Sequence, residues 1–367
     1  MTFAARTLGY LASPTFNAFT APTVIGGNNT FFVKAVAVSS RGLYVAVGYD
    51  STGVYQVSRY PMYSTSTDGI TWTTPARINN FASSCTMLNI AVYNAGSYDS
   101  FVAIGTFEAT GYPAYAVFDG SNWSNPIAMG GTTTAAVMQG ITVNSSGLFV
   151  AVGFDNTTTY TPLYAYSSDY GNTWTAPAQL GASTGYIMTS IAVNSSGKFV
   201  AVGNTPSFGN GVYATSTNGT TWSSTPTALP SNASYAITVP YITVNSSNLF
   251  VATGQGNGLV NLSFGAYTTS TDGSTWTTPG RLSTPTFVPR AITVNSIGVF
   301  VTVGNSGNGN FSYASSSNGT TWVTGAIAGY DGLDVAVSTT SPTKFIAVCQ
   351  ANNETPVRGY SSYAIYP

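Results

Sequence analysis

The chain has 367 residues, of which 43% are hydrophobic and only 6% are charged, and its net charge is −1. This length suffices for two ordinary domains or one large all-β domain with a sizeable core. The lack of any basic cluster argues against a nucleic-acid partner. Histidine is absent, which removes the usual general base and the commonest metal ligand, so we expect no metal and no cofactor.

The N-terminal segment 1–16 carries Arg6 but lacks the apolar core of a secretory signal peptide. No stretch approaches 18 apolar residues, so we expect no membrane insertion. If the protein works outside a cell, it leaves by another route, such as a virion assembled in the cytoplasm. Two cysteines, Cys85 and Cys349, are too few for a disulfide framework, and we expect both to be buried and unpaired.

Two phrases recur along the chain. The first, typified by "ITVNSSGLFVAVG", reads as two short apolar strands joined by a tight turn. It occurs at 36–48, 141–153, 191–203, 242–254 and 292–304, with weaker copies at 90–105 and 335–349. The second, typified by "STDGITW", reads as a third strand, a turn and a Trp-containing fourth strand. It occurs at 66–72, 167–174, 216–222, 270–276 and 316–322, with a degenerate copy at 118–123.

Seven units of about 50 residues, each with four strands, predict a seven-bladed β-propeller that occupies residues 1–367 as one domain. The last unit, 335–367, ends after its third strand. The missing partner is at the start of the chain, where "FTAPTVI" (19–25) parallels "WTAPAQL" (174–180). We therefore expect the N-terminal segment 1–25 to complete the last blade and close the ring.

The turn of the second phrase has a structural explanation. An Asp or Asn side chain accepts hydrogen bonds from its own turn, a Gly takes the positive φ, and the Trp packs between sheets. Because Asn replaces Asp in two copies, a ring of cation-binding aspartates fits poorly. The residues concerned are Asp68, Asp169, Asn218, Asp272 and Asn318, with Trp72, Trp174, Trp222, Trp276 and Trp322.

"SSDYGNTW" matches the pattern Ser-x-Asp-x-Gly-x-Thr-Trp, and over nearly its whole length the chain resembles the Asp-box (BNR) repeat proteins with sialidase-like β-propellers. The resemblance implies structural Asp boxes that lie away from the active site. It also implies three arginines that hold the substrate carboxylate, a Tyr–Glu nucleophile pair and an Asp acid/base. Only Glu108 and Glu354 are available, and the arginines are dispersed, so we expect no catalytic residues and a protein that is not an enzyme.

The loops after each "FVAVG" strand differ in every unit, and they lie at the opposite face from the repeated turns. Their aromatic and amide side chains suit sugar rings and hydroxyls, so any ligand is expected on this face. The alternative is that they are only rigid, soluble loop residues. The candidate ligand-binding residues are Tyr49, Tyr55, Tyr60, Tyr112, Tyr160, Phe208, Phe264 and Phe311.

Three functions follow from this pattern. The leading hypothesis is a non-catalytic binding or adhesion propeller on an external surface, a virion or phage appendage or a secreted lectin-like protein, whose partner is a glycan or host-surface receptor. The alternative is a structural subunit of a virion or extracellular assembly that contacts only neighbouring proteins. The third is a divergent exo-glycosidase, which the missing sialidase residues disfavour.

Overall fold

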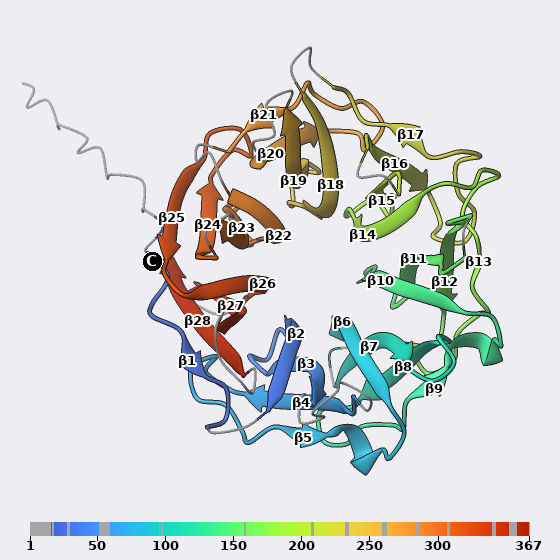
Figure 1. Ribbon diagram of the computed structural model, residues 1–367, viewed down its shortest axis with the longest axis vertical. Helices are drawn as coiled ribbons and strands as arrows, with labels where there is room; N and C mark the ends of the chain where they lie inside the picture. Colours follow the sequence, from blue (N-terminus) through green and yellow to red (C-terminus); the bar gives the residue numbers. More distant parts are fainter. Residues whose placement is uncertain are drawn as a thin grey trace, which may run out of the picture.

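The computed structural model contains seven four-stranded antiparallel sheets arranged radially around a central axis (Figure 1). This confirms the predicted seven-bladed propeller. The structure describes residues 16–366, apart from positions 17, 95, 97 and 158 and the segments 28–29, 51–58, 207–208, 232–234, 259–262, 283–286, 307–308, 340–342 and 352–357.

Each blade runs from the axis outward in chain order, except that blade 7 takes its outermost strand from the N-terminus. The innermost strands of blades 1 to 7 are β2 (Phe31–Val38), β6 (Cys85–Asn94), β10 (Ala136–Val143), β14 (Ile187–Val193), β18 (Tyr235–Val244), β22 (Phe287–Val294) and β26 (Tyr330–Val337). The second strands are β3 (Tyr44–Asp50), β7 (Asp99–Phe107), β11 (Phe149–Asp155), β15 (Phe199–Asn204), β19 (Phe250–Gly258), β23 (Phe300–Ser306) and β27 (Thr343–Ala351).

Outside these two strands, each blade has a third strand and an outermost strand, and the outermost strand is the shortest of the four. The third strands are β4 (Pro61–Ser66), β8 (Pro113–Phe118), β12 (Pro162–Ser167), β16 (Gly211–Ser216), β20 (Ser263–Ser270), β24 (Phe311–Ser316) and β28 (Gly359–Tyr366). The outermost strands are β5 (Ala76–Arg77), β9 (Ile127–Ala128), β13 (Ala178–Gln179), β17 (Thr227–Ala228), β21 (Gly280–Arg281), β25 (Val323–Ile327) and, for blade 7, β1 (Thr23–Val24). Two short 3-10 turns, Ile78–Asn80 and Met129–Gly131, follow β5 and β9.

Ring closure follows the prediction. Strand β1 pairs with β28 in antiparallel fashion, and Thr23 faces Ser361. Backbone bonds continue on both sides of this short ladder, from Ile25 N to Gly359 O and from Thr20 N to Tyr363 O, each 2.9 Å. Phe19 is buried against the third strand of blade 6. The two ends of the chain are therefore joined by both hydrogen bonds and apolar contact.

The outermost strands are shorter than the sequence pattern predicts, because the Trp lies in the turn and a Pro follows it. A Pro has no N–H to donate to a ladder, so pairing begins only after it. Blade 6 is the exception that supports this explanation: its segment "WVTGAI" has no Pro, and β25 pairs along five residues, 323–327.

A repeated aromatic arrangement joins neighbouring blades. In blades 2 to 7 the second strand begins or nearly begins with a fully buried Phe (Phe101, Phe149, Phe199, Phe250, Phe300 and Phe345). Farther out, a Tyr of one third strand packs on the Trp of the next blade. Tyr164, for example, lies 6.0 Å from Trp222 between ring centroids, and its hydroxyl donates to Thr220 O at 2.8 Å.

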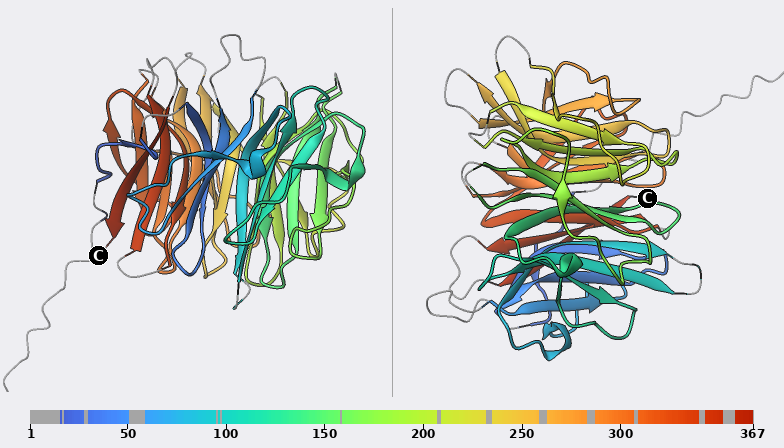
Figure 2. Two further views of the ribbon diagram at one scale, coloured as in Figure 1. Left: turned by 90° about the horizontal axis from the view of Figure 1, so that it is seen from below. Right: turned by 90° about the vertical axis from the view of Figure 1, so that its right-hand side faces the viewer.

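The strands run between two different faces of the disc (Figure 2). We call the face with the "SSG" and Asp-box turns the turn face, and the face with the loops after the second strands and the connections between blades the loop face. The two kinds of turn meet on the turn face, where Lys198 Nζ of blade 4 donates to Ser274 Oγ of blade 5 at 2.7 Å. Among the described residues, no helix is long and apolar enough to span a membrane.

Both cysteines are buried and unpaired, as predicted. Cys85 lies at the start of β6 in blade 2, and Cys349 lies on β27 in blade 7. Burial raises the pKa of the Cys85 thiol to about 12, so this thiol stays protonated and unreactive at neutral pH.

Candidate ligand site in the central channel

Every innermost strand carries a register irregularity near its middle. In six blades one residue is skipped in the pairing with the second strand: Lys34, Leu88, Gln139, Thr189, Arg290 and Leu333. In blade 5 the shift falls between Thr238 and Tyr241, on either side of Pro240, which cannot donate to the ladder. Bulges of this kind re-aim side chains, and here they turn residues of all seven blades toward the axis.

The glycine that closes each "FVAVG" strand makes the bulge feasible. Gly153 faces Met138 directly before the bulge, and a Cβ at Gly153 would overlap with the carbonyl oxygen of Val137. Gly48, Gly105, Gly203 and Gly304 lie against a carbonyl oxygen in the same way. In blade 7 the pair is reversed, because Cys349 faces Gly332. The repeated glycine is therefore required by close backbone approach and not by a left-handed conformation.

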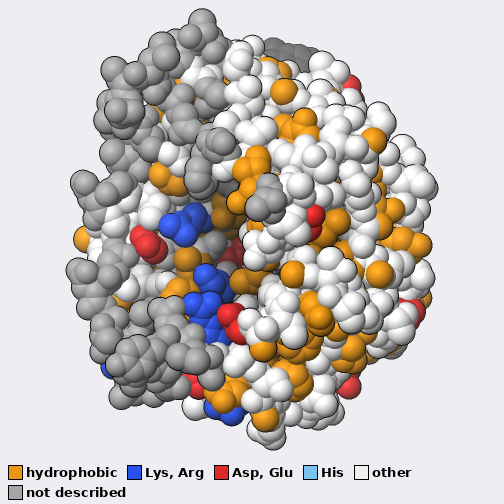
Figure 3. All heavy atoms as spheres, turned by 45° about the vertical axis from the view of Figure 1, so that its right-hand side comes forward, with side chains coloured by type: hydrophobic (Ala, Val, Ile, Leu, Met, Phe, Trp, Pro, Cys, Tyr) orange, Lys and Arg blue, Asp and Glu red, His pale blue; other side chains and the backbone are white. Residues whose placement is uncertain are grey.

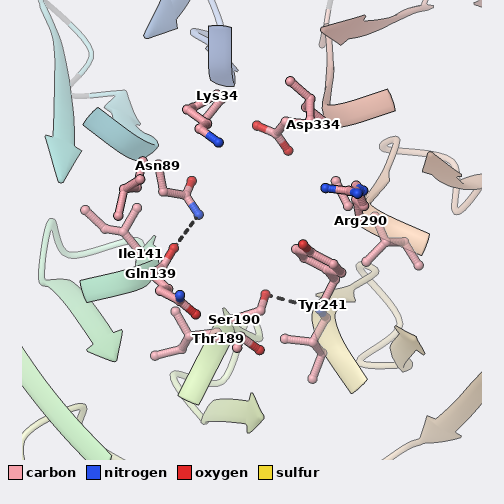
Figure 4. Close-up of a pocket in the computed structure, with 16 residues that line it drawn as sticks. Lys34, Asn89, Gln139, Ile141, Thr189, Ser190, Tyr241, Arg290 and Asp334 are labelled. Atoms are coloured by element: carbon pink, nitrogen blue, oxygen red, sulfur yellow. Dashed lines mark hydrogen bonds between the residues drawn. The ribbon is translucent and has the colours of Figure 1, made fainter. Parts of the chain in front are cut away.

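The bulges line a cavity of about 370 Å³ at the centre of the ring, within the range of small-molecule sites (Figure 4). Its wall has two chemically different parts. Blades 5, 6, 7 and 1 contribute what we call the ionisable arc, which consists of Tyr241, Arg290, Asp334 and Lys34. Blades 2, 3 and 4 contribute the neutral arc, which consists of Asn89, Gln139, Thr189 and Ser190. A space-filling view shows Lys and Arg atoms gathered in a hollow in the middle of the molecule (Figure 3).

Several lining residues also link neighbouring blades. Asn89 Nδ2 donates to Gln139 O at 2.8 Å, Ser190 Oγ accepts from Ile242 N at 3.2 Å, and Asp334 Oδ2 accepts from Val36 N at 2.9 Å. All three occupy the position after the bulge. This position therefore holds the inner strands together, and it leaves the polar groups of the bulge residues directed at the cavity.

The electrostatics of the ionisable arc are unusual. Burial raises the pKa of Asp334 to about 7, against the opposing effect of hydrogen bonds from the backbone of Val36 and Val335. Burial, together with the nearby charges of Arg290 and Arg59, lowers the pKa of Lys34. Burial raises the pKa of Tyr241 to about 12. All four residues of the ionisable arc are half-buried and line the cavity. A ligand in the cavity can therefore reach their side chains.

Two cations of the cavity have no neutralising partner in the part of the chain that the structure describes. Within the described residues, neither Lys34 nor Arg290 has a carboxylate at ion-pair distance, and Arg290 Nε is buried without a hydrogen-bond partner. Figure 4 shows the amine of Lys34 and the carboxylate of Asp334 directed toward one another, with Arg290 and Tyr241 reaching into the same cavity from the neighbouring blades. Because Asp334 is only partly ionised near neutral pH, the arc has a net positive charge.

The loop-face edge of blade 1 extends this chemistry outward. Phe32 and Tyr49 stack at 4.6 Å, with Lys34 Nζ 4.6 Å from the Phe32 centroid. The guanidinium of Arg59 lies 5.0 Å from the Tyr49 centroid and within 3.6 Å of the Glu108 carboxylate. An aromatic surface flanked by cations thus leads from the cavity toward the loop face.

The predicted ligand-binding residues differ in how deeply they are buried. Phe264 and Phe311 are buried in apolar clusters and Tyr49 is 9% exposed, so the prediction that they offer a ring face to a ligand is wrong. They pack inward because each lies in a strand and not in the loop beside it. Three half-buried rings, Tyr60, Tyr112 and Tyr160, remain candidates for ligand binding. Tyr55 and Phe208 lie outside the described residues.

The residues of the predicted Asp boxes lie in the turns at the turn face. Asp68 Oδ1 accepts from Ile70 N at 2.8 Å and Thr71 N at 2.7 Å, and Asn218 Oδ1 accepts from Thr220 N and Thr221 N at 3.0 and 2.9 Å. Burial alone would raise the pKa of Asp68, yet these N–H groups lower it to about 2. The oxygen of either side chain satisfies the same two donors. Asp169, Asp272 and Asn318 make the corresponding bonds, and Trp72, Trp174, Trp276 and Trp322 are buried while Trp222 is half-buried.

The sequence interpretation missed all eight residues of the two arcs. The signal was nevertheless present. The two positions before each "ITV", "IAV" or "VAV" differ from unit to unit and include Lys34, Arg290 and Asp334, while their surroundings repeat. Variation at fixed positions of a repeated strand marks the surface that the repeats share, which here is the channel.

Comparison with known proteins identifies the fold. No family model matches the chain, and no curated protein sequence matches it. Among solved structures, a Dyadobacter fermentans protein of unknown function is 12% identical, with 95% of this chain and 99% of that chain covered and a TM-score of 0.58. A PL25 ulvan lyase is 11% identical, with 92% and 95% covered and a TM-score of 0.58.

Sialidases are also similar in structure. The Trypanosoma rangeli sialidase is 13% identical over 95% of this chain, with a TM-score of 0.52, and this chain spans 55% of its length. At such identities the likeness establishes the propeller alone. The prediction that the chain is not an enzyme is wrong, because its structural neighbours include polysaccharide lyases as well as sialidases. The missing sialidase residues argued only against sialidase activity, whereas enzymes with this fold also include polysaccharide lyases. The chain is thus similar in fold to sialidases and polysaccharide lyases.

Proposed function

We propose that the protein recognises an acidic saccharide in its central channel. The observation that carries the proposal is the pair Lys34 and Arg290, two cations that have no carboxylate partner among the described residues and line one cavity opposite a wall of neutral hydrogen-bonding groups. The whole chain has only ten Lys and Arg residues, so two of them at one recessed place are a specific feature.

The two arcs match the two parts of such a ligand. A guanidinium and an ammonium bind a carboxylate or sulfate, and the amide and hydroxyl groups of Asn89, Gln139, Thr189 and Ser190 suit sugar hydroxyls. The half-buried ring of Phe32, which Tyr49 backs, extends the site from the cavity in the direction that a longer chain of sugars would follow. One structural neighbour, an ulvan lyase, is known bound to -[GlcA(1-4)Rha3S]-, an acidic saccharide.

Several predictions from the sequence are compatible with binding of an acidic saccharide. The resemblance to Asp-box (BNR) repeat proteins, a role in adhesion and a location outside a cell or on a virion or phage appendage remain predictions from the sequence. The glycan partner is the part that the channel supports, because its polar lining has the chemistry of a saccharide site.

Binding of an acidic polysaccharide by the purified chain tests the proposal. Titration calorimetry with polygalacturonate should give binding that its carboxyl-reduced form lacks. Lys34→Gln should weaken the affinity by about 10–100-fold, the value of a charge-assisted hydrogen bond. Lys198→Gln on the turn face is the matched control and should bind like the wild type. Equal binding of the neutral polymer, or an unchanged affinity of Lys34→Gln, would refute the proposal.

The pH dependence gives an independent check. The pKa of Lys34 is lower than that of an ordinary lysine, so it loses its proton at a lower pH. Asp334, whose pKa is about 7, gains its negative charge around that pH. Both changes make the cavity less positive as the pH rises. Saccharide carboxylates stay ionised throughout this range. The affinity should therefore fall between about pH 6 and about pH 8.

A further inference from the structure

We infer that the channel cleaves 4-linked uronate polysaccharides by β-elimination, with Asp334 as the base that removes the C5 proton and Tyr241 as the acid that protonates the leaving O4 oxygen. The inference rests on the proposed function, because it requires that an acidic saccharide occupies the cavity. It adds a reaction and assigns roles to residues of the ionisable arc.

The chemical inventory of the cavity separates elimination from hydrolysis. Hydrolysis of a glycoside ordinarily uses two carboxyl groups, and a Tyr nucleophile needs an adjacent Glu to activate it. Among the described lining residues, Asp334 is the sole carboxyl group and no Glu is present. Elimination needs one base, one acid and cations that neutralise the uronate carboxylate, and the ionisable arc supplies each of these.

The placement of the four residues supports the roles. Lys34 and Asp334 lie on adjacent inner strands of blades 1 and 7, and Arg290 and Tyr241 lie on the next two strands, so the arc spans four consecutive blades. Figure 4 shows Asp334 and Tyr241 reaching into the cavity from different parts of the arc with Arg290 between them. A carboxylate held by Lys34 and Arg290 would therefore face the base, with the acid next to it on the other side of Arg290.

The reaction balances without any co-reactant. Asp334 takes the C5 proton, the C5–H electron pair forms the C4=C5 double bond, and the C4–O4 pair leaves on the oxygen, which takes the phenolic proton of Tyr241. Water then returns both residues to their starting protonation states. The two cations lower the cost of the negative charge that develops next to the carboxylate.

The proton affinities of the two groups agree with these roles. A base works best when its pKa is near the working pH, and burial brings that of Asp334 to about 7. Tyr241 keeps its proton at neutral pH, because burial raises its pKa to about 12, and it can therefore donate that proton to a developing alkoxide.

The test follows the ultraviolet absorbance of the unsaturated uronate product, with polygalacturonate, alginate and ulvan as 4-linked uronate polymers and dextran as the neutral control. The wild type should produce the chromophore from at least one acidic polymer and not from dextran. Asp334→Asn, whose amide oxygen can still accept the Val36 N–H bond, should lose at least about 100-fold in rate while it still binds the polymer.

Tyr241→Phe should lose a similar factor and retain binding, which covers the case in which Asp334→Asn fails to fold. Asp119→Asn is the matched control: its carboxylate also accepts backbone N–H bonds, from Ser121 and Asn122, but lies in a turn outside the cavity, so its rate should be unchanged. Calorimetric binding without any unsaturated product from the wild type would overturn the elimination and leave the proposed binding intact. Full activity in Asp334→Asn or Tyr241→Phe would overturn the assigned roles, and absence of binding would overturn both proposals.

Discussion

At the scale of single residues, Asp334 shows how its surroundings decide what an aspartate does. Asp68 lies in an open turn where two N–H groups stabilise its charge, and its pKa falls to about 2. Asp334 accepts one bond from Val36 N, but burial dominates and raises its pKa to about 7. The sequence marks Asp68 through its turn motif. It offers no such motif for Asp334, only variation between the repeats, because the burial of that residue depends on all seven blades meeting at the axis.

The pKa of Asp334 predicts a pH-dependent stability. The folded state holds this proton more tightly than the unfolded chain, so the associated stability is present below about pH 4 and is lost as the pH rises through about 7. Asp334→Asn cannot ionise and keeps an acceptor for Val36 N. As the pH rises from about 4 to about 7, the wild type should therefore lose roughly 2 kcal/mol of its free energy of unfolding relative to this variant. Denaturant titrations at several pH values measure the difference, and a constant difference would contradict the raised pKa.

At the scale of the strand pair, the repeated "FVAVG" phrase specifies more than a strand. The second strands, the tight turns and their order were predictable from the alternation of apolar residues and turn residues. The bulge opposite the glycine was not, because it lies in the part of the innermost strand that precedes the repeated phrase, where the residues differ from unit to unit. Pro240 and Pro289 are visible clues to irregular pairing in inner strands.

Substitution of one of these glycines tests the link between the phrase and the bulge. A Cβ at Gly203 would overlap with Ile187 O, so Gly203→Ala should destabilise the fold by about 2–3 kcal/mol and disturb the channel wall at Thr189. Gly185→Ala is the control: its φ is +85° but nothing lies within 4 Å, so only the backbone strain of about 1 kcal/mol remains. Equal melting temperatures for the two variants would show that the close approach at Gly203 is not limiting.

At the scale of the whole molecule, closure of the ring was the most predictable feature. The unpaired third strand at 359–366 and the orphan strand pattern at 19–25 are complementary, and only a closed ring uses both. The functional class was less predictable, because the search for sialidase residues addressed a single chemistry. The channel residues belong to seven separate units, and no contiguous motif contains them.

Removal of the closing segment tests how far the ring depends on it. Deletion of residues 1–25 removes the bonds from Thr20 and Ile25 to β28 and exposes the surface that Phe19 covers, so the melting temperature should fall sharply, by the equivalent of several kcal/mol. Deletion of residues 1–15 alone is the matched control, because it keeps Phe19, Thr20 and Ile25. Similar melting curves for the two truncations would contradict closure by this strand.

The central claim, that the channel is a site for acidic saccharides, is tested most directly by a crystal structure of Asp334→Asn with a uronate tetrasaccharide. We expect a sugar ring in the cavity, its carboxylate between Lys34 and Arg290 and its hydroxyls against Asn89 and Gln139. A saccharide bound instead at the turn face or on the outer strands, with the channel empty at saturating ligand, would contradict it.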